Sequence, residues 1–360
     1  MGKSNSAFTE WQLTVLVITA GMCGMNFYHQ NFGRWSGLLL AAAIALSLLS
    51  MAMLAKSFSL SGSLSFPELL RENLGNLPAR ILLAGATVYF ACEIACLTVR
   101  QTRMTGLFLL EKTPPQVIPA VTLLTVCFLI TSGIRQVART AELLFPAILL
   151  PLLFILGMGL FSLDFGELLP LLHSDDLPLR SLPEYFSSLG GITAAAFFAG
   201  YYNKQKLRKC LLSGVMALAA LCAGVLLCCT GVFSMEGTKH LSFPLTELSR
   251  VVSIGSVTLN HRFDILYIMI YNAVTLLSTG ILLYCCCISL CGLFGVKSHS
   301  VFIFLLLPVL YAVSYLSLSD DTVVNCIADW GKPVFLAGVI PAVYAATNIR
   351  TKKKGCDGNQ

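Results

Sequence analysis

Apolar stretches of about 20 residues recur along this chain, and they constrain its fold more than any other feature. A helix needs about 20 apolar residues to cross the hydrocarbon core of a bilayer. Only 12% of the 360 residues are charged and 56% are hydrophobic, whereas soluble domains carry about 25% charged residues. The sequence therefore predicts an all-α polytopic membrane protein and excludes a soluble enzyme held by one anchor.

The apolar stretches predict about ten transmembrane helices. They cover residues 11–31, 35–55, 80–103, 116–134, 141–162, 186–202, 210–233, 264–294, 300–318 and 333–348. The connections between them are too short for a separate soluble domain, so residues 1–360 are expected to form one membrane domain. The first ten residues have no apolar core, and no cleavable signal sequence is expected.

The basic residues set the expected orientation. They fall in the connections, in the tails or near span ends, and more of the 24 Lys and Arg lie on the inner side if the N-terminus is cytoplasmic. The positive-inside rule then predicts that both termini are cytoplasmic. Asp320, Asp321 and Asp329 are expected in a solvated outer loop before the last span. The net charge of +6 reflects these anchors rather than a nucleic-acid partner, and Cys and His lack the spacing of a metal site, so no cofactor is expected.

Glycines interrupt the first apolar stretch halfway along. Gly21 and Gly24 are followed by Met25 and Asn26. Glycine in a helix interior costs about 0.8–1 kcal/mol relative to alanine. A broken membrane helix also leaves backbone groups without water. Two interpretations stay open: small residues let two helices pack closely, or a discontinuous helix uses its free backbone groups to bind a solute.

The sixth stretch has a matching interruption. Gly190 and Gly191 lie near its start, flanked by Ser187 and Thr193. The first and sixth spans begin two halves of five helices each, about residues 11–162 and 186–348. Glycine-broken segments in corresponding positions indicate a binding site at a repeat interface. The pair therefore favours a transporter-like protein with discontinuous helices 1 and 6.

Polar side chains in the third and eighth spans are candidates for the walls of this site. Glu93 lies near mid-depth, where an acid costs about 2.5–3.5 kcal/mol and must face protein or water. It is either a proton or substrate contact, or an acid paired with Arg100 or bonded to a neighbouring helix. Tyr89 lies four residues earlier, on a similar face. Tyr271 and Thr275 carry hydroxyls that either ligate a cation or bond to a neighbouring carbonyl.

Three smaller features complete the pattern. A short helix is expected at Pro67–Leu74 on the cytoplasmic side, with Phe66 in the usual cap position and Ser65 close enough upstream to help cap it. An amphipathic helix is expected within residues 242–255, lying over the outer mouth. Arg139 and Glu142 are expected to form an ion pair at the inner surface, at the start of the fifth span.

Several short motifs occur in a distinctive order. They are TPPQVI at 113–118, GIRQVARTAELLFP at 133–146, Asp164 followed by Leu-Leu-Pro at 168–170, FPLTELSR at 243–250 and a closing basic tail. With these motifs the whole chain resembles the B subunits of GerA-type spore germinant receptors, in the amino acid/polyamine/organocation transporter superfamily. The resemblance implies a LeuT-like fold of two inverted five-helix repeats in the spore inner membrane.

The resemblance also implies a function and partners. A small germinant, often an amino acid, would bind at the broken helices, and the chain would assemble with an A-type subunit and a lipoprotein C-type subunit. The residues expected to bind the ligand are Gly21, Cys23, Gly24, Met25, Asn26, Tyr89, Glu93, Gly190, Gly191, Thr193, Tyr271 and Thr275.

The chain departs from this family at both breaks. Relatives often have a proline after the first glycine break, where Met25 and Asn26 stand here, and Gly-Glu in span 6, where Gly191 and Ile192 stand. The class of ligand is therefore open. The alternatives are a ligand-independent ion channel or scaffold subunit, and an ordinary amino-acid permease. An enzyme is not expected, because no nucleophile–base pair or metal-protease motif occurs.

Overall fold

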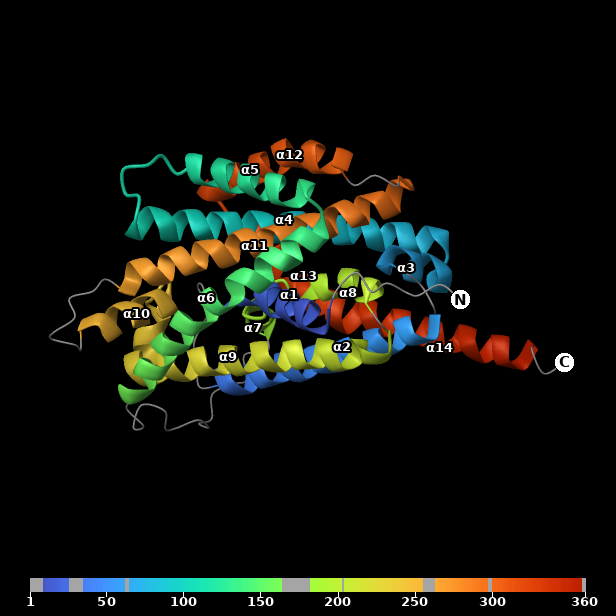
Figure 1. The fold of residues 1–360 in the computed structure, drawn as a ribbon, viewed down its shortest axis with the longest axis horizontal. Helices are drawn as coiled ribbons and strands as arrows, with labels where there is room; N and C mark the ends of the chain where they lie inside the picture. Colours follow the sequence, from blue (N-terminus) through green and yellow to red (C-terminus); the bar gives the residue numbers. More distant parts are fainter. Residues whose placement is uncertain are drawn as a thin grey trace.

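The computed structural model describes residues 9–25, 35–61, 65–163, 182–202, 204–254, 263–296 and 300–357, and the regular structure in these ranges is helical (Figure 1). The helices up to the middle of the chain are α1 (Glu10–Met22), α2 (Ser36–Ser61), α3 (Phe66–Leu74), α4 (Asn76–Phe108), α5 (Val117–Thr131), α6 (Ile134–Phe161) and α7 (Leu182–Ser187). They are followed by η2 (Ile192–Ala194), α8 (Ala195–Phe198), η3 (Ala199–Tyr201), α9 (Lys204–Lys239), α10 (Pro244–Ile254), α11 (Phe263–Phe294), α12 (Ser300–Ser319), α13 (Thr322–Pro333), η4 (Val334–Val339) and α14 (Ile340–Asp357).

Seven of the described helices are long and apolar enough to cross a membrane. They are α2, α4, α6, α9, α11, α12 and one continuous helix that runs through α13, η4 and α14. This confirms a polytopic α-helical membrane protein. Two shorter apolar helices, Val117–Thr131 and Ile192–Tyr201, accompany them. The count of ten spans and their arrangement as two inverted repeats stay predictions.

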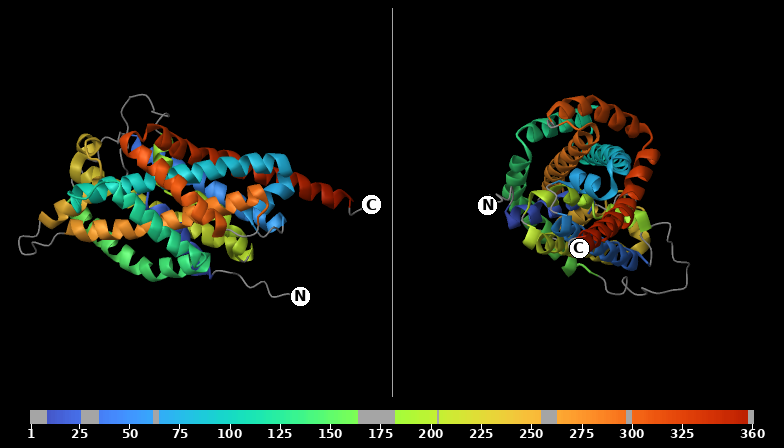
Figure 2. Two further views of the ribbon diagram at one scale, coloured as in Figure 1. Left: turned by 90° about the horizontal axis from the view of Figure 1, so that it is seen from above. Right: turned by 90° about the vertical axis from the view of Figure 1, so that its right-hand side faces the viewer.

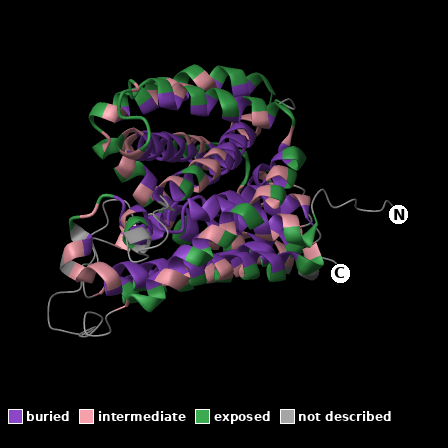
Figure 3. Ribbon diagram, turned by 60° about the vertical axis from the view of Figure 1, so that its left-hand side comes forward, coloured by how far each residue is buried: buried purple, intermediate pink, exposed green. Residues whose placement is uncertain are grey.

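The core is built around α4 and α11, which pack along each other (Figures 1 and 2). They are the most buried of the seven helices, whereas α12 is among the least buried, and Figure 3 shows burial concentrated inside the bundle. Hydroxyls within the long helices donate hydrogen bonds to backbone carbonyls one turn back. Ser47 of α2 donates to the Ala43 carbonyl and Thr102 of α4 donates to the Thr98 carbonyl, both at 2.7 Å. Such bonds satisfy polar groups where water is absent.

The two short amphipathic helices are confirmed. The first, α3, begins at Phe66, and Ser65 is its N-cap and accepts a hydrogen bond from the Glu68 backbone at 3.4 Å. Capping by Ser65 is confirmed, whereas the expectation that Phe66 holds the cap position was wrong. Gly75, with φ +90°, ends α3. In α10, Leu245 and Leu248 are buried. The role of α10 as a cover over the outer mouth stays a prediction.

The fifth span starts earlier than expected. Helix α6 begins at Ile134, directly after Gly133 with φ +86°, so Arg139 lies on the helix. The predicted pair between Arg139 and Glu142 was wrong for the described residues: Glu142 accepts a hydrogen bond from the Gln12 side chain of α1 at 2.9 Å. The Glu142 carboxylate therefore links α6 to α1 instead of pairing with Arg139 on its own helix.

The prediction of an outer loop before the last span was also wrong in part. The last helix begins at Thr322 rather than at residue 333, so Asp329 lies on α13 and Lys332 is buried, with 1% of its surface exposed. Asp320 and Asp321 do precede the helix. The sequence predicted a loop at these aspartates because an unpaired charge is costly inside a bilayer. In the folded protein, side chains of other helices supply the partners.

Candidate functional site

Regular winding is lost at both glycine sites. Helix α1 ends at Met22, and Cys23 to Met25 form a turn. Residues 182–201, here called the interrupted segment, consist of α7, a turn at 188–191, and then η2, α8 and η3. Gly190 has φ +52°, a conformation that L side chains rarely adopt. Asn26, which was expected in the site, lies outside the described residues.

The two interruptions lie against each other. The Gly191 N–H donates a hydrogen bond to the Ala20 carbonyl at 2.8 Å. A Cβ atom at Gly24 would lie 2.3 Å from the Ser187 carbonyl oxygen, and one at Gly190 would lie 2.4 Å from the Gly21 carbonyl oxygen. The close-packing interpretation is therefore confirmed, and the winding is interrupted at both sites as predicted. That the loosened backbone binds a solute stays a prediction.

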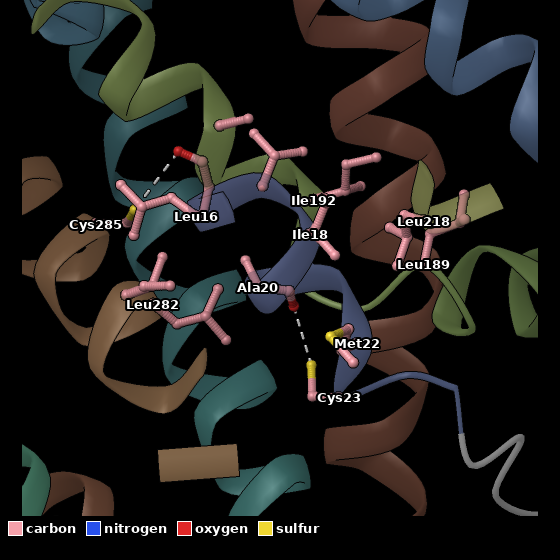
Figure 4. Packing of buried hydrophobic residues seen from close by; sticks show 14 of the residues in the cluster. Leu16, Ile18, Ala20, Met22, Cys23, Leu189, Ile192, Leu218, Leu282 and Cys285 are labelled. Carbon is pink, nitrogen blue, oxygen red and sulfur yellow. Dashed lines mark hydrogen bonds between the residues drawn. The ribbon is translucent and has the colours of Figure 1, made fainter. Parts of the chain in front are cut away.

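Apolar side chains surround this contact (Figure 4). Leu189 and Ile192 come from the interrupted segment, Leu218 from α9 and Leu282 from α11, and all four are buried. A Cβ atom at Gly21 would lie 2.1 Å from the Leu218 side chain, so the end of α1 is tightly enclosed on that side as well.

Side chains already bind several of the loosened carbonyls. The Cys23 thiol donates to the Ala20 carbonyl at 3.1 Å, and the Ser278 hydroxyl donates to the Thr19 carbonyl at 2.8 Å. The Cys222 thiol donates to the Ser188 carbonyl at 3.4 Å. A solute donor at the Ala20 or Ser188 carbonyl would replace a weak thiol contact with a stronger hydrogen bond, since a thiol is a poor donor.

The predicted walls come together on one side. The Tyr89 hydroxyl of α4 lies 3.0 Å from the Thr193 hydroxyl of the interrupted segment, and both residues are buried. Helix α11 lies beside α1 through Ser278, one turn after Thr275. The Thr275 hydroxyl, however, donates to the Tyr271 carbonyl at 2.8 Å, so in this structure it is used within its own helix.

A buried ion pair lies next to the interrupted segment. Glu93 Oε1 of α4 is 2.9 Å from Lys332 Nζ of α13, and both side chains are almost completely buried. Lys332 also donates to the Ser187 hydroxyl at 3.1 Å, and that hydroxyl donates to Asp329 Oδ1 at 2.6 Å. Arg100 Nη2 lies 4.0 Å from the same carboxylate oxygen. Of the alternatives for Glu93, a contact with a neighbouring helix is the one found, with Lys332 of α13 rather than Arg100 as its closest charged partner.

This arrangement places both signs of charge at the break. Moving each ion out of water costs several kcal/mol, and only a close partner with further hydrogen bonds compensates. The second oxygen of Glu93, Oε2, is buried and has no hydrogen-bond partner among the described residues. It is an acceptor able to receive an ammonium or hydroxyl donor. Within the described ranges, no group of three or more His, Cys, Asp or Glu is placed to hold a metal ion.

Sequence reasoning missed Lys332 and Asp329. Their spacing of three residues puts them on one face of a helix, and apolar residues follow them up to Val343. That pattern is the signal that a helix with one polar face, rather than a loop, precedes the last apolar stretch. Ser187 had been noted only as a neighbour of the glycine pair.

Comparison with known proteins gives the family. A family described as spore germination proteins matches residues 16–322. This chain belongs to the spore germination protein family. It is also similar to the spore germination protein YndE of Bacillus subtilis strain 168, with 24% identity over 333 residues, which cover 90% of this chain and 91% of that protein. The family is one of transporters or receptors rather than of enzymes, which confirms that expectation.

Proposed function

We propose that this protein is the membrane subunit of a spore germinant receptor and that it binds a small nutrient germinant of amino-acid type between the end of α1 and the interrupted segment. The observation that carries the proposal is the meeting of two unwound backbones beside a buried pair of opposite charges, Glu93 and Lys332. Unwound membrane helices are tolerated where they serve a cavity or a ligand.

The chemistry of the site suits a zwitterion. Glu93 Oε2 is an acceptor for an ammonium group, and Lys332 is a donor for a carboxylate, with the Ser187 hydroxyl beside it. The acid that relatives often carry at residue 192 is replaced here by Glu93 on a neighbouring helix. We infer a LeuT-like fold, cytoplasmic termini, and assembly with an A-type and a lipoprotein C-type subunit in the spore inner membrane.

Thermal unfolding of the purified protein with a panel of amino acids tests the proposal. A ligand at 100 times its Kd stabilises the folded state by about 2.7 kcal/mol. We expect stabilisation by at least one amino acid, loss of that effect in Thr193→Val, and an unchanged effect in Thr125→Val, a matched change at an exposed position on α5. Leucine at Gly24 is unsuited as a test, because the Ser187 carbonyl fills the space for its side chain.

The outcomes separate the alternatives. No stabilisation across the panel would contradict the proposal and favour a channel or scaffold subunit without a ligand of its own. Uptake of the stabilising amino acid into proteoliposomes that contain only this subunit would instead identify an ordinary permease.

A further inference from the structure

A cavity lies on the side of the bundle where α13 packs against α4. It has a volume of about 560 Å³ and extends from α13 into the η4 segment. Ile81, Gly85 and Tyr89 line it from α4, and Trp330, Val334 and Val339 line it from the last helix. Its lining side chains are apolar apart from the Tyr89 phenol and the Trp330 indole. We call it the α4–α13 groove.

Two glycines shape the groove. At Gly85, a Cβ atom would meet nothing within 4 Å, so the missing side chain leaves open space. At Gly331, a Cβ atom would lie 2.3 Å from Tyr89 Cδ2, so that position is taken by the tyrosine ring. Tyr89 is buried and forms the floor, while Val334 and Trp330 are exposed at the rim, at 59% and 53%.

The groove lies within two helices long and apolar enough to cross a membrane, and its rim is exposed to the surrounding medium. Water does not occupy a space without polar partners, and an empty space of this size forfeits the dispersion contacts of its lining. Its residues on the last helix run from Ile327 to Val339, which is about 18 Å along the helix axis at 1.5 Å per residue. The space is therefore long, narrow and roughly parallel to the lipid chains.

We propose that the α4–α13 groove binds one acyl chain of a bilayer phospholipid. A transmembrane helix of a partner fits less well, because helix contacts in membranes use stripes of small residues, whereas Trp330, Val334 and Phe335 form much of this wall. The bound chain contacts Tyr89, whose hydroxyl lies 3.0 Å from Thr193 in the interrupted segment. Lipid therefore touches a residue that also touches the proposed ligand site.

Fluorescence of Trp330 tests this proposal directly. In a variant with Trp11→Phe and Trp35→Phe, Trp330 is the remaining tryptophan of the chain. Phosphatidylcholine with brominated acyl chains is added to the protein in detergent micelles, and bromine quenches a tryptophan that it contacts. We expect quenching that saturates near one lipid per protein. Gly85→Leu, which fills the groove, should weaken this binding at least tenfold.

Gly157→Leu on α6 is the matched control, since a Cβ atom there also meets nothing within 4 Å, and it should bind lipid like the parent. If Gly85→Leu does not fold, Val334→Phe at the rim replaces it. Non-saturating quenching, or equal quenching in the filled variant and the control, would overturn the proposal. So would photo-crosslinking from residue 334 in native membranes to another protein chain rather than to lipid, which would identify a partner helix as the occupant.

Discussion

At the scale of single residues, the pairing of Glu93 with Lys332 is the most consequential contact in the molecule. Both charges are buried in a region built of apolar helices, and each stabilises the other. Removing one partner from such a pair leaves an uncompensated buried charge, which costs about 3–5 kcal/mol, whereas replacing both with neutral groups is often nearly neutral. The contact is therefore a stability determinant as well as a candidate ligand contact.

Lys332→Met should lower the free energy of unfolding by about 3–5 kcal/mol, because Glu93 Oε1 loses its cation. The double variant Glu93→Gln/Lys332→Met should recover most of that loss. Equilibrium unfolding in mixed micelles measures both. The exposed pair of Lys206 with Glu10 is the control, and Lys206→Met should change the stability far less. A single variant as stable as the parent would show that the buried pair is not needed.

At the scale of elements, the interrupted segment decides the architecture of the site. Within it, Ser187 contacts Lys332, Gly191 contacts the backbone of α1 and Thr193 contacts Tyr89, on either side of or in the turn at 188–191. These three contacts join α4, α13 and α1 through fewer than ten consecutive residues. A regular helix through the same stretch would rotate these groups to different faces, since residues in an α-helix are 100° apart. The turn at Gly190 is therefore what makes the convergence possible.

Gly190→Ala should destabilise the protein by at least about 2 kcal/mol. The left-handed conformation costs roughly 1–2 kcal/mol for an L residue, and the new methyl group would also lie 2.4 Å from the Gly21 carbonyl oxygen. Gly37→Ala in the first turn of α2 is the control, because a Cβ atom there meets nothing within 4 Å. Thermal unfolding of the two variants should separate them clearly. Equal stability would mean that the turn adapts without cost.

At the scale of the whole molecule, the bundle surrounds α4 and α11, with α14 leaving it at the end where α3 lies (Figure 1). The Arg350 guanidinium donates to the Glu72 carbonyl at this end, which links the last helix to α3. Asp320 lies at the opposite end, between α12 and α13, and Thr322 donates to its carboxylate through both its backbone N–H and its hydroxyl. These bonds hold the pKa of Asp320 below its usual value, so this carboxylate stays ionised at neutral pH.

Labelling of introduced cysteines tests the predicted orientation. In a background with Cys326→Ser and Cys356→Ser, a membrane-impermeant maleimide on intact cells should label Asp320→Cys and not Val296→Cys. These positions flank α12, which crosses between them. If both termini are cytoplasmic, the Asp320 side is external. Permeabilised cells should label both variants, and the reverse pattern on intact cells would contradict the prediction.

The class of protein and the places where helices lose their winding follow from local sequence. Whether a segment enters a bilayer depends on its own apolar content, and whether it can leave helical geometry depends on its own glycines, as at Gly24 and Gly190. The helix α3 and the amphipathic α10 could be predicted in the same way. The resemblance to the family could also be detected from the sequence, because each motif is a run of consecutive residues.

The partners of the buried charges were not predictable from the same information. Glu93 had a near candidate in Arg100, seven residues away on its own helix, yet its partner Lys332 comes from the far end of the chain. Which charges meet depends on how α4, α13 and the interrupted segment pack together, and the large cost of a lone buried ion selects the packing that pairs them. Hydropathy is a property of a segment, whereas a buried ion pair is a property of the assembled bundle, and so only the tertiary structure decided it.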